Sequence, residues 1–238
     1  MLALKATHPF KERTQISIPL IALAAVAFHT LVSVTHGGPV AVPDVSAYLS
    51  ISQWLNGGLL PEPLNYHPGY GLLLAPLGWL NGNDLHAVAL IFNGLLAGGI
   101  VLLIAKFARR LGLPNHLVTL AAFLAAVHPS TALSSRIAWP ETLILLIILS
   151  VTLLLFANRW LIAGLVSTVA ICVHPRLIVL TLAIIVTGIY IKELKKTTLG
   201  FIVGIVVVVV VLTATNTWPD ARVQAARSIG SGPSPIAT

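Results

Sequence analysis

Long apolar runs, separated by short polar turns, limit this chain to a small set of folds. Charged residues make up only 9% of its 238 residues, whereas apolar residues make up 57%. A soluble domain carries roughly 25% charged residues, which help to cover its surface. Because this chain has too few of them, a water-soluble enzyme, a disordered tail and a fibrous repeat are excluded as classes. The composition predicts an all-α polytopic membrane protein.

The apolar runs predict about seven transmembrane helices, since a spanning helix needs about 20 mostly apolar residues. A basic stretch precedes the first run, so a cleaved signal peptide is the alternative to a first span. The predicted spans are 16–34, 85–108, 117–127, 142–157, 161–173, 177–191 and 199–214. The predicted organisation is a single transmembrane domain (1–238) with a cytoplasmic tail (1–15), a first span, a long outer loop with short interfacial helices (36–80), six further spans (85–214) and a polar outer tail (215–238).

The basic residues orient this predicted topology. Turns on the cytoplasmic side of a membrane are enriched in Lys and Arg. With a cytoplasmic amino terminus, 14 − 4 = 10 basic residues lie at inward-facing ends, and the four left outside are Arg136, Arg176, Arg222 and Arg227. The net charge of +7 therefore indicates topology. We expect a protein of the plasma (inner) membrane with its carboxyl terminus outside, and no nucleic-acid partner.

Ionisable and polar residues gather at the predicted outer face. Such residues are costly near the membrane, so each is a candidate for function, with contact to lipid headgroups as the alternative. Two of the outward-running helices are short, which predicts a recessed site that opens sideways to lipid. The candidates are Asp44, Tyr48, His67, His128, Arg136, Glu141, His174 and Arg176.

The residue types suggest roles for these candidates. Asp44 has the chemistry of a general base toward a hydroxyl, or of a helix N-cap. Tyr48 lies four residues later and would share its helical face. Arg136 and Arg176 can each bind a phosphate with two hydrogen bonds, although Arg136 could instead pair with Glu141. Glu141 follows a proline and is expected in the first turn of a helix.

The motifs of several other classes are missing. The sequence has no Walker loop, no Rossmann glycine pattern and no HExxH motif. Cys172 is the single cysteine, so an internal disulfide and a cysteine metal cage are both excluded. No two histidines form a close-spaced ligand pair, so we predict neither a metal site nor a cofactor.

Three motifs, in this order, resemble the polytopic GT-C glycosyltransferases that use polyprenyl-phosphate sugars. Among these are the protein O-mannosyltransferases and the 4-amino-arabinose lipid A transferases. The motifs are Asp44-Val-Ser-Ala-Tyr48 in the outer loop, Tyr66-His-Pro-Gly-Tyr70 before an apolar stretch, and Trp139-Pro140-Glu141 before a span. The resemblance covers residues 16–214, a seven-helix module.

The resemblance implies transfer of a sugar from a polyprenyl-phosphate donor on the outer face. Asp44 would deprotonate or orient the acceptor hydroxyl, and Arg176, with His174 or Arg136, would stabilise the leaving phosphate. Members of the family usually continue with further spans, so a membrane protein partner is expected to supply the missing elements. The alternatives are a non-catalytic scaffold or lipid-binding subunit, and a lipid-carrier flippase, which would need a polar pathway through the spans.

Overall fold

The computed structural model describes residues 17–36, 43–57 and 67–215, and every regular element within these ranges is a helix. The helices are α1 (Ser17–His36), α2 (Pro43–Trp54), α3 (Gly69–Leu74), η1 (Ala75–Leu77), α4 (Gly82–Arg110), α5 (Asn115–Ala126), α6 (Pro129–Ser135), α7 (Glu141–Phe156), α8 (Trp160–Val169), η2 (Ala170–Cys172), η3 (Pro175–Leu177), α9 (Ile178–Tyr190) and α10 (Leu194–Ala214). Here η denotes a short 3-10 helix.

Each of the seven predicted spans coincides with helical structure. Helices α1, α4 and α10 are long and apolar enough to cross a membrane alone. Helices α5 and α6 together make a fourth candidate, bent by 42° at the break between them. Helix α7, the pair α8–η2 and the pair η3–α9 are apolar but shorter. The described part of the chain is therefore all-helical, with three to four helices that are long and apolar enough to cross a membrane.

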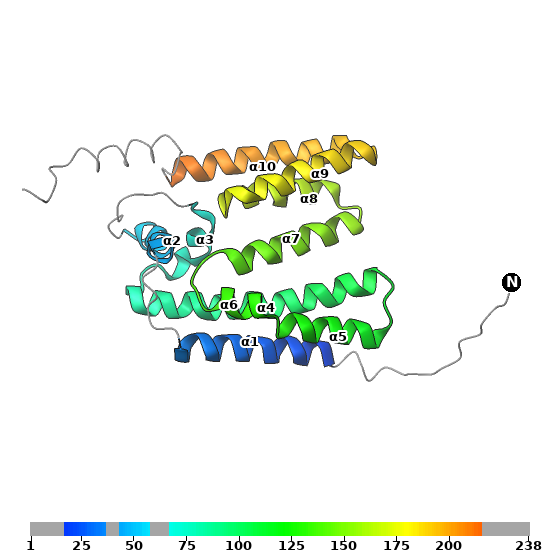
Figure 1. Cartoon of the computed structure of the whole chain (residues 1–238). Helices are drawn as coiled ribbons and strands as arrows, with labels where there is room; N and C mark the ends of the chain where they lie inside the picture. The colour runs from blue at the N-terminus through cyan, green and yellow to red at the C-terminus, as the bar shows by residue number, and fades with distance from the viewer. Residues whose placement is uncertain (1–16, 37–42, 58–66, 216–238) are drawn as a thin grey trace, which may run out of the picture.

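The long helices lie side by side and run alternately in opposite directions (Figure 1). The α4–α5, α7–α8 and α9–α10 turns consequently meet at one end of the bundle. We call this the basic end, because it carries Lys106, Arg109, Arg110, Arg159, Lys192, Lys195 and Lys196. The opposite end, here the α2–α3 end, holds the two short helices together with the α6–α7 and η2–η3 turns.

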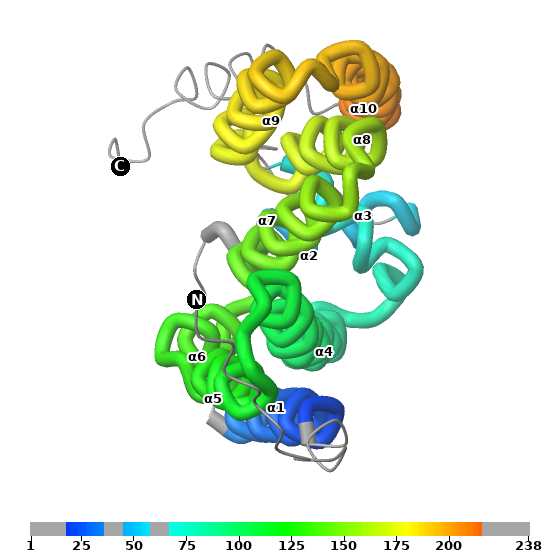
Figure 2. Tube along the Cα trace, turned by 90° about the vertical axis from the view of Figure 1, so that its right-hand side faces the viewer, coloured from blue at the N-terminus to red at the C-terminus, as the bar shows by residue number. Residues whose placement is uncertain are grey.

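Viewed along their axes, the helices form two groups joined by α7 (Figure 2). The first group contains α1, α4, α5 and α6, and the second contains α8, α9 and α10. Helix α7 contacts α4 on one side and α8 on the other. At the α2–α3 end, one buried cluster of apolar side chains joins both groups, because α2 and α3 pack against α4, α7 and the η2–η3 turn.

Glycines allow the helices to approach closely within each group. A Cβ atom on Gly94 or Gly98 of α4 would collide with Thr30 or Val26 of α1. A Cβ atom on Gly200 or Gly204 of α10 would likewise collide with α8. Both pairs have the GxxxG spacing that brings helix backbones together in membranes. Van der Waals contact over these small residues thus holds α1 to α4 and α8 to α10.

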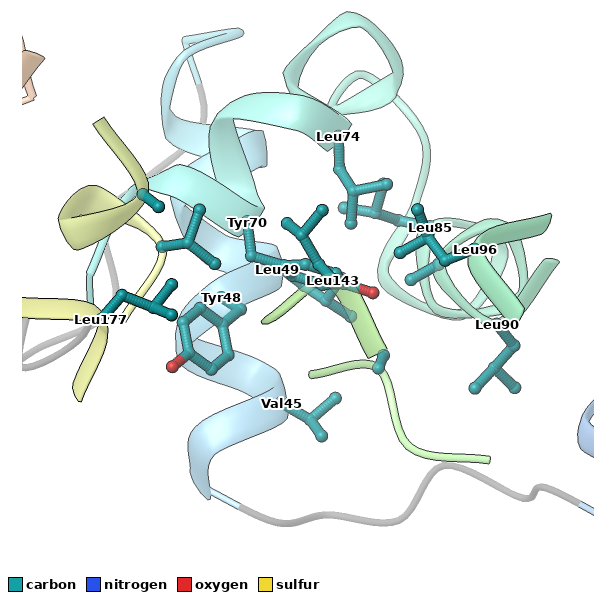
Figure 3. Close-up of a cluster of buried hydrophobic side chains, with 14 residues drawn as sticks. Val45, Tyr48, Leu49, Tyr70, Leu74, Leu85, Leu90, Leu96, Leu143 and Leu177 are labelled. Carbon is teal, nitrogen blue, oxygen red and sulfur yellow. The ribbon is translucent and has the colours of Figure 1, made fainter. Parts of the chain in front are cut away.

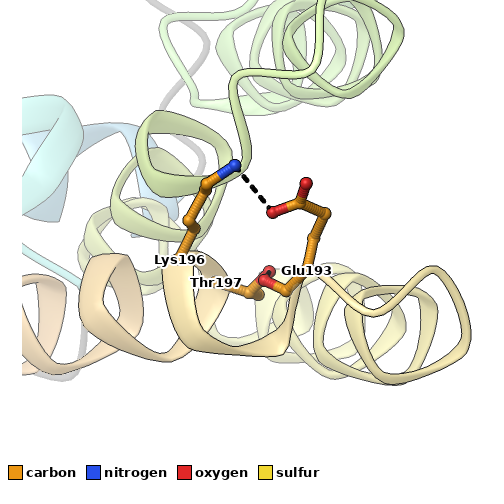
Figure 4. A network of polar contacts seen from close by, with 3 residues as sticks. All are labelled: Glu193, Lys196 and Thr197. Carbon is orange, nitrogen blue, oxygen red and sulfur yellow. Dashed lines mark hydrogen bonds and ion pairs between the residues drawn. The ribbon is translucent and has the colours of Figure 1, made fainter.

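The turn between α9 and α10 is closed by local polar contacts (Figure 4). The ammonium group of Lys196 pairs with the carboxylate of Glu193 at 2.9 Å, and the Thr197 hydroxyl donates to the Glu193 carbonyl at 3.1 Å. Lys192, at φ 64°, adopts the left-handed conformation that turns the chain between the two helices. These contacts fix the only acid that the described residues place at the basic end.

Candidate functional site

The α2–α3 end is organised around two buried tyrosines. The rings of Tyr48 in α2 and Tyr70 in α3 meet edge to face, with centroids 5.8 Å apart. Figure 3 shows both within the buried cluster, together with Val45 and Leu177. Gly71 lies against the Tyr48 carbonyl, where any Cβ atom would collide. The close contact of α3 with α2 therefore positions both rings.

Tyr70 and Asn93 tie three segments together. The Tyr70 hydroxyl donates to Oδ1 of Asn93 in α4 at 3.0 Å. The Asn93 amide donates in turn to the carbonyl of Ile137 at 2.7 Å and to that of Trp139 at 3.4 Å. These carbonyls belong to the α6–α7 turn, which leads directly into Glu141. The Asn93 side chain thus holds the start of α7 beside α3.

The pKa of the Tyr70 hydroxyl is raised well above its usual range. Burial is the main cause, because it disfavours the charged phenolate. The negative charge of Glu141 raises it further, whereas the bond to Asn93 acts in the opposite direction. Glu141 therefore lies within electrostatic reach of Tyr70. The prediction that Glu141 occupies the first turn of a helix is confirmed, since α7 begins at this residue.

His67 and His174 lie next to each other, with ring centroids 5.9 Å apart. His174 caps η3, because its Nδ1 accepts a hydrogen bond from the Arg176 backbone N–H at 3.2 Å. Arg176 itself is exposed, within η3. Burial lowers the pKa of His174, and the positive charge of Arg176 lowers it further. The neutral imidazole is therefore favoured here.

Asp44 lies inside α2, which begins at Pro43. The expectation that Asp44 caps this helix is corrected, since the helix starts one residue before it. Proline suits this first position because its missing N–H has no partner within the helix. Asp44 thus occupies the first turn of α2, one turn before Tyr48. Its side chain is not among those that the structure describes. Glu62, the other acid of the predicted outer loop (36–80) and the alternative candidate for the base, also lies outside them.

His128 lies at the break between α5 and α6. Helix α5 ends at Ala126, in agreement with the predicted run 117–127, and α6 then continues the chain to Ser135. Pro129 breaks the helix, and His128 caps α6 by accepting the Ser130 N–H at 3.3 Å. His128 lines a cavity of about 340 Å³ between α4, α5 and α7. It therefore belongs to the first helix group, apart from the His67–His174 pair.

Arg136 ends α6 and is exposed on the α6–α7 turn. It is thus at the α2–α3 end, on the α6–α7 turn, whereas Arg176 lies in η3. The described part of the chain contains no group of three or more His, Cys, Asp or Glu side chains that could hold a metal ion. Arg222 and Arg227 lie outside the described residues.

Sequence reasoning did not single out Asn93 or His29. Both are polar residues within apolar runs, and that is the signal that could have identified them. The Nε2 atom of His29 bonds the carbonyl of Ala126 at 3.0 Å, and its Nδ1 atom bonds the Ser135 hydroxyl at 3.2 Å. His29 in α1 therefore supplies a hydrogen-bond partner to the carbonyl at the α5–α6 break and to Ser135. Asn93 in α4 does the same for the carbonyls of the α6–α7 turn.

Comparisons of the chain with protein-family models, with curated proteins and with solved structures gave no match.

Proposed function

We propose that the chain is a membrane glycosyltransferase that acts at the α2–α3 end, on the extracytoplasmic face of the plasma membrane. One observation supports this proposal most directly. Val45, Leu143 and Leu177 belong to a single buried cluster. They lie next to Asp44, two residues after Glu141 and next to Arg176, respectively. The helix that carries Asp44, the start of α7 and η3, which carries Arg176, are therefore packed together.

The proposed reaction needs a base and a site for a phosphate. An acceptor hydroxyl attacks the anomeric carbon of a polyprenyl-phosphate sugar, and Asp44 takes the hydroxyl proton. The bond between the anomeric carbon and the phosphate oxygen breaks. The released polyprenyl phosphate keeps the electron pair, and the guanidinium of Arg176 stabilises its charge. His174, two residues before Arg176, and His67, whose ring lies next to that of His174, would bind the same leaving group.

The proposal includes seven membrane crossings with the basic end in the cytoplasm. Its support is the concentration of Lys and Arg at the basic end, where all three inward turns meet. The shorter helices fit this arrangement if their outer ends lie below the membrane surface, at the bottom of a recess. The 13 residues of Trp160–Cys172 rise about 20 Å, against a hydrocarbon core of about 30 Å. A recess at the α2–α3 end would admit a lipid-linked donor from the side.

The test is a transfer assay in membranes with labelled polyprenyl-phosphate sugars. Asp44→Asn should lower transfer by a factor on the order of 10² or more, because a positioned base is lost. Arg176→Lys keeps the charge but loses the paired geometry, so it should weaken transfer less than Arg176→Ala. Glu193→Gln, at the opposite end, is the control and should be neutral. If Glu62→Gln abolishes transfer while Asp44→Asn does not, the assignment of the base is wrong.

A non-catalytic scaffold or lipid-binding subunit is the second candidate. The burial of two tyrosines favours it, since Tyr48 is 4% and Tyr70 0% exposed. Rings that close a core stabilise a fold without contacting substrate. This candidate would replace the enzyme if the wild-type chain transfers no sugar, while Asp44→Asn leaves both its stability and its lipid binding unchanged.

A further inference from the structure

A second cavity, of about 270 Å³, lies at the basic end between the carboxyl-terminal halves of α4 and α7. Two cationic side chains line it from α4, and a hydroxyl lines it from α7. The remaining walls are apolar. The lining residues are Leu103, Lys106, Arg110, Ser150, Leu153, Leu154 and Ala157. The cavity therefore combines positive charge, a hydrogen-bond donor and an apolar surface.

The two cations share one face of α4. Lys106 and Arg110 are four residues apart, so their side chains lie one helical turn from each other. Neither makes an ion pair with an acid of the described residues, and Glu193, the described acid of this end, is paired with Lys196. Both α4 and α7 end here, and their last carbonyls repel an anion. An anion would therefore be held by the two side chains rather than by the backbone.

The apolar walls favour a lipid over a free anion as the ligand of this cavity. Leu103, Leu153 and Leu154 provide a surface against which a hydrocarbon chain can pack. Phe107 and Phe156 meet edge to face with centroids 5.5 Å apart, which joins α4 to α7 at this level of the bundle. Lys106 and Arg110 lie near the end of α4 with Leu103 nearly one turn deeper, and Leu153 and Leu154 lie near the end of α7 with Ser150 nearly one turn deeper. A lipid in the cavity would therefore meet the cations at the mouth, and the leucines and the Ser150 hydroxyl along its length.

We propose that this cavity binds one anionic phospholipid, with its phosphate between Lys106 and Arg110 and an acyl chain along the α4–α7 leucines. The Ser150 hydroxyl donates a hydrogen bond to the same lipid from the opposite wall. Basic pockets between membrane helices are suited to such headgroups, because each cation adds attraction to the phosphate. This site lies at the end of the bundle opposite the proposed glycosyltransferase site, and its occupation does not depend on that function.

The test measures retained lipid on the full chain, purified in detergent with equal amounts of phosphatidylglycerol and phosphatidylcholine. Native mass spectrometry counts the bound molecules of each lipid. We expect the wild type to retain phosphatidylglycerol. The double variant Lys106→Gln/Arg110→Gln should lower its occupancy about tenfold, since two cations near the phosphate are removed. The matched control is Lys192→Gln/Lys195→Gln, which removes two charges from the same end but none from the cavity.

A further variant tests the cavity itself without changing charge. Ser150→Leu fills part of the space and removes the hydroxyl, so it should also lower phosphatidylglycerol retention. Equal losses in the cavity variant and the control would overturn the proposal, because general attraction to the basic end would then explain binding. Equal retention of phosphatidylcholine would overturn it as well. So would protection by inorganic phosphate alone, measured as a rise in the unfolding temperature that the double variant abolishes, because the site would then be one for free phosphate.

Discussion

At the scale of single residues, Asn93 is a buried polar side chain that links three segments of the chain. Its amide joins α3, α4 and the α6–α7 turn through three hydrogen bonds, and it is fully buried. We predict that Asn93→Leu lowers the free energy of unfolding by about 1–3 kcal/mol, because the Ile137 carbonyl and the Tyr70 hydroxyl both lose their partner. Thermal unfolding in detergent measures the change. Asn115→Ala, at an exposed position, should be nearly neutral. Equal effects of the two would contradict the role of Asn93.

We predict that His174 makes the stability of the chain depend on pH. Its pKa in the folded chain lies below the ordinary 6.5. The unfolded chain therefore binds more protons as the pH falls below that value, and stability decreases in the same direction. A proton on Nδ1 would also break the hydrogen bond from the Arg176 N–H, and it would add a charge beside Arg176 and His67. The wild type should thus lose stability from pH 7.5 to pH 5.

The His174→Asn variant isolates this contribution. Asparagine caps helices well without titrating, so the variant should lose less stability than the wild type over the same pH range. Unfolding temperatures in detergent at pH 7.5 and pH 5 provide the comparison. His116→Asn, at the exposed start of α5, is the control and should behave like the wild type. A fall in the His174→Asn variant as large as that of the wild type would rule out His174 as the source.

At the scale of elements, glycines set how closely the helices approach. A Cβ atom on Gly94 or Gly200 would meet the facing helix, whereas one on Gly82 would meet nothing within 4 Å. We predict that Gly94→Ala and Gly200→Ala each cost about 1–3 kcal/mol through overpacking. Gly82→Ala should be neutral or slightly stabilising, because alanine favours a helix. Unfolding in detergent tests all three variants. Similar effects at Gly82 and Gly94 would show that helix propensity, and not contact with the facing helix, sets the change in stability.

At the scale of the whole molecule, the topology can be tested by labelling cysteines in cells. In a Cys172→Ala background, Gly82→Cys lies in open space at the α2–α3 end, and Lys195→Cys is exposed at the basic end. A membrane-impermeant maleimide should label position 82 in intact cells and position 195 only after permeabilisation. This result follows from the positive-inside rule. Labelling of both positions in intact cells, or of neither, would disprove the proposed orientation.

The sequence by itself determined the class and the positions of the helices. The reason is that lipid requires apolar side chains and satisfied backbone groups, so the runs show directly where helices form. All seven predicted runs are helical, and the basic turns lie together at one end. The first turn of α7 at Glu141 was likewise predictable, since Pro140-Glu141 acts locally.

The tertiary structure alone decided which polar residues meet. The contact of His67 with His174 joins residues 107 positions apart (174 − 67), and nothing local in the sequence encodes it. The same holds for the bond between Tyr70 and Asn93, and for the cavity that gathers Lys106, Arg110 and Ser150. Pro129 indicates a break in the helix at His128 but not whether the chain continues in the same direction. The imidazole of His29 in α1 helps to fix that direction, because it bonds the Ala126 carbonyl at the break and the Ser135 hydroxyl at the end of α6.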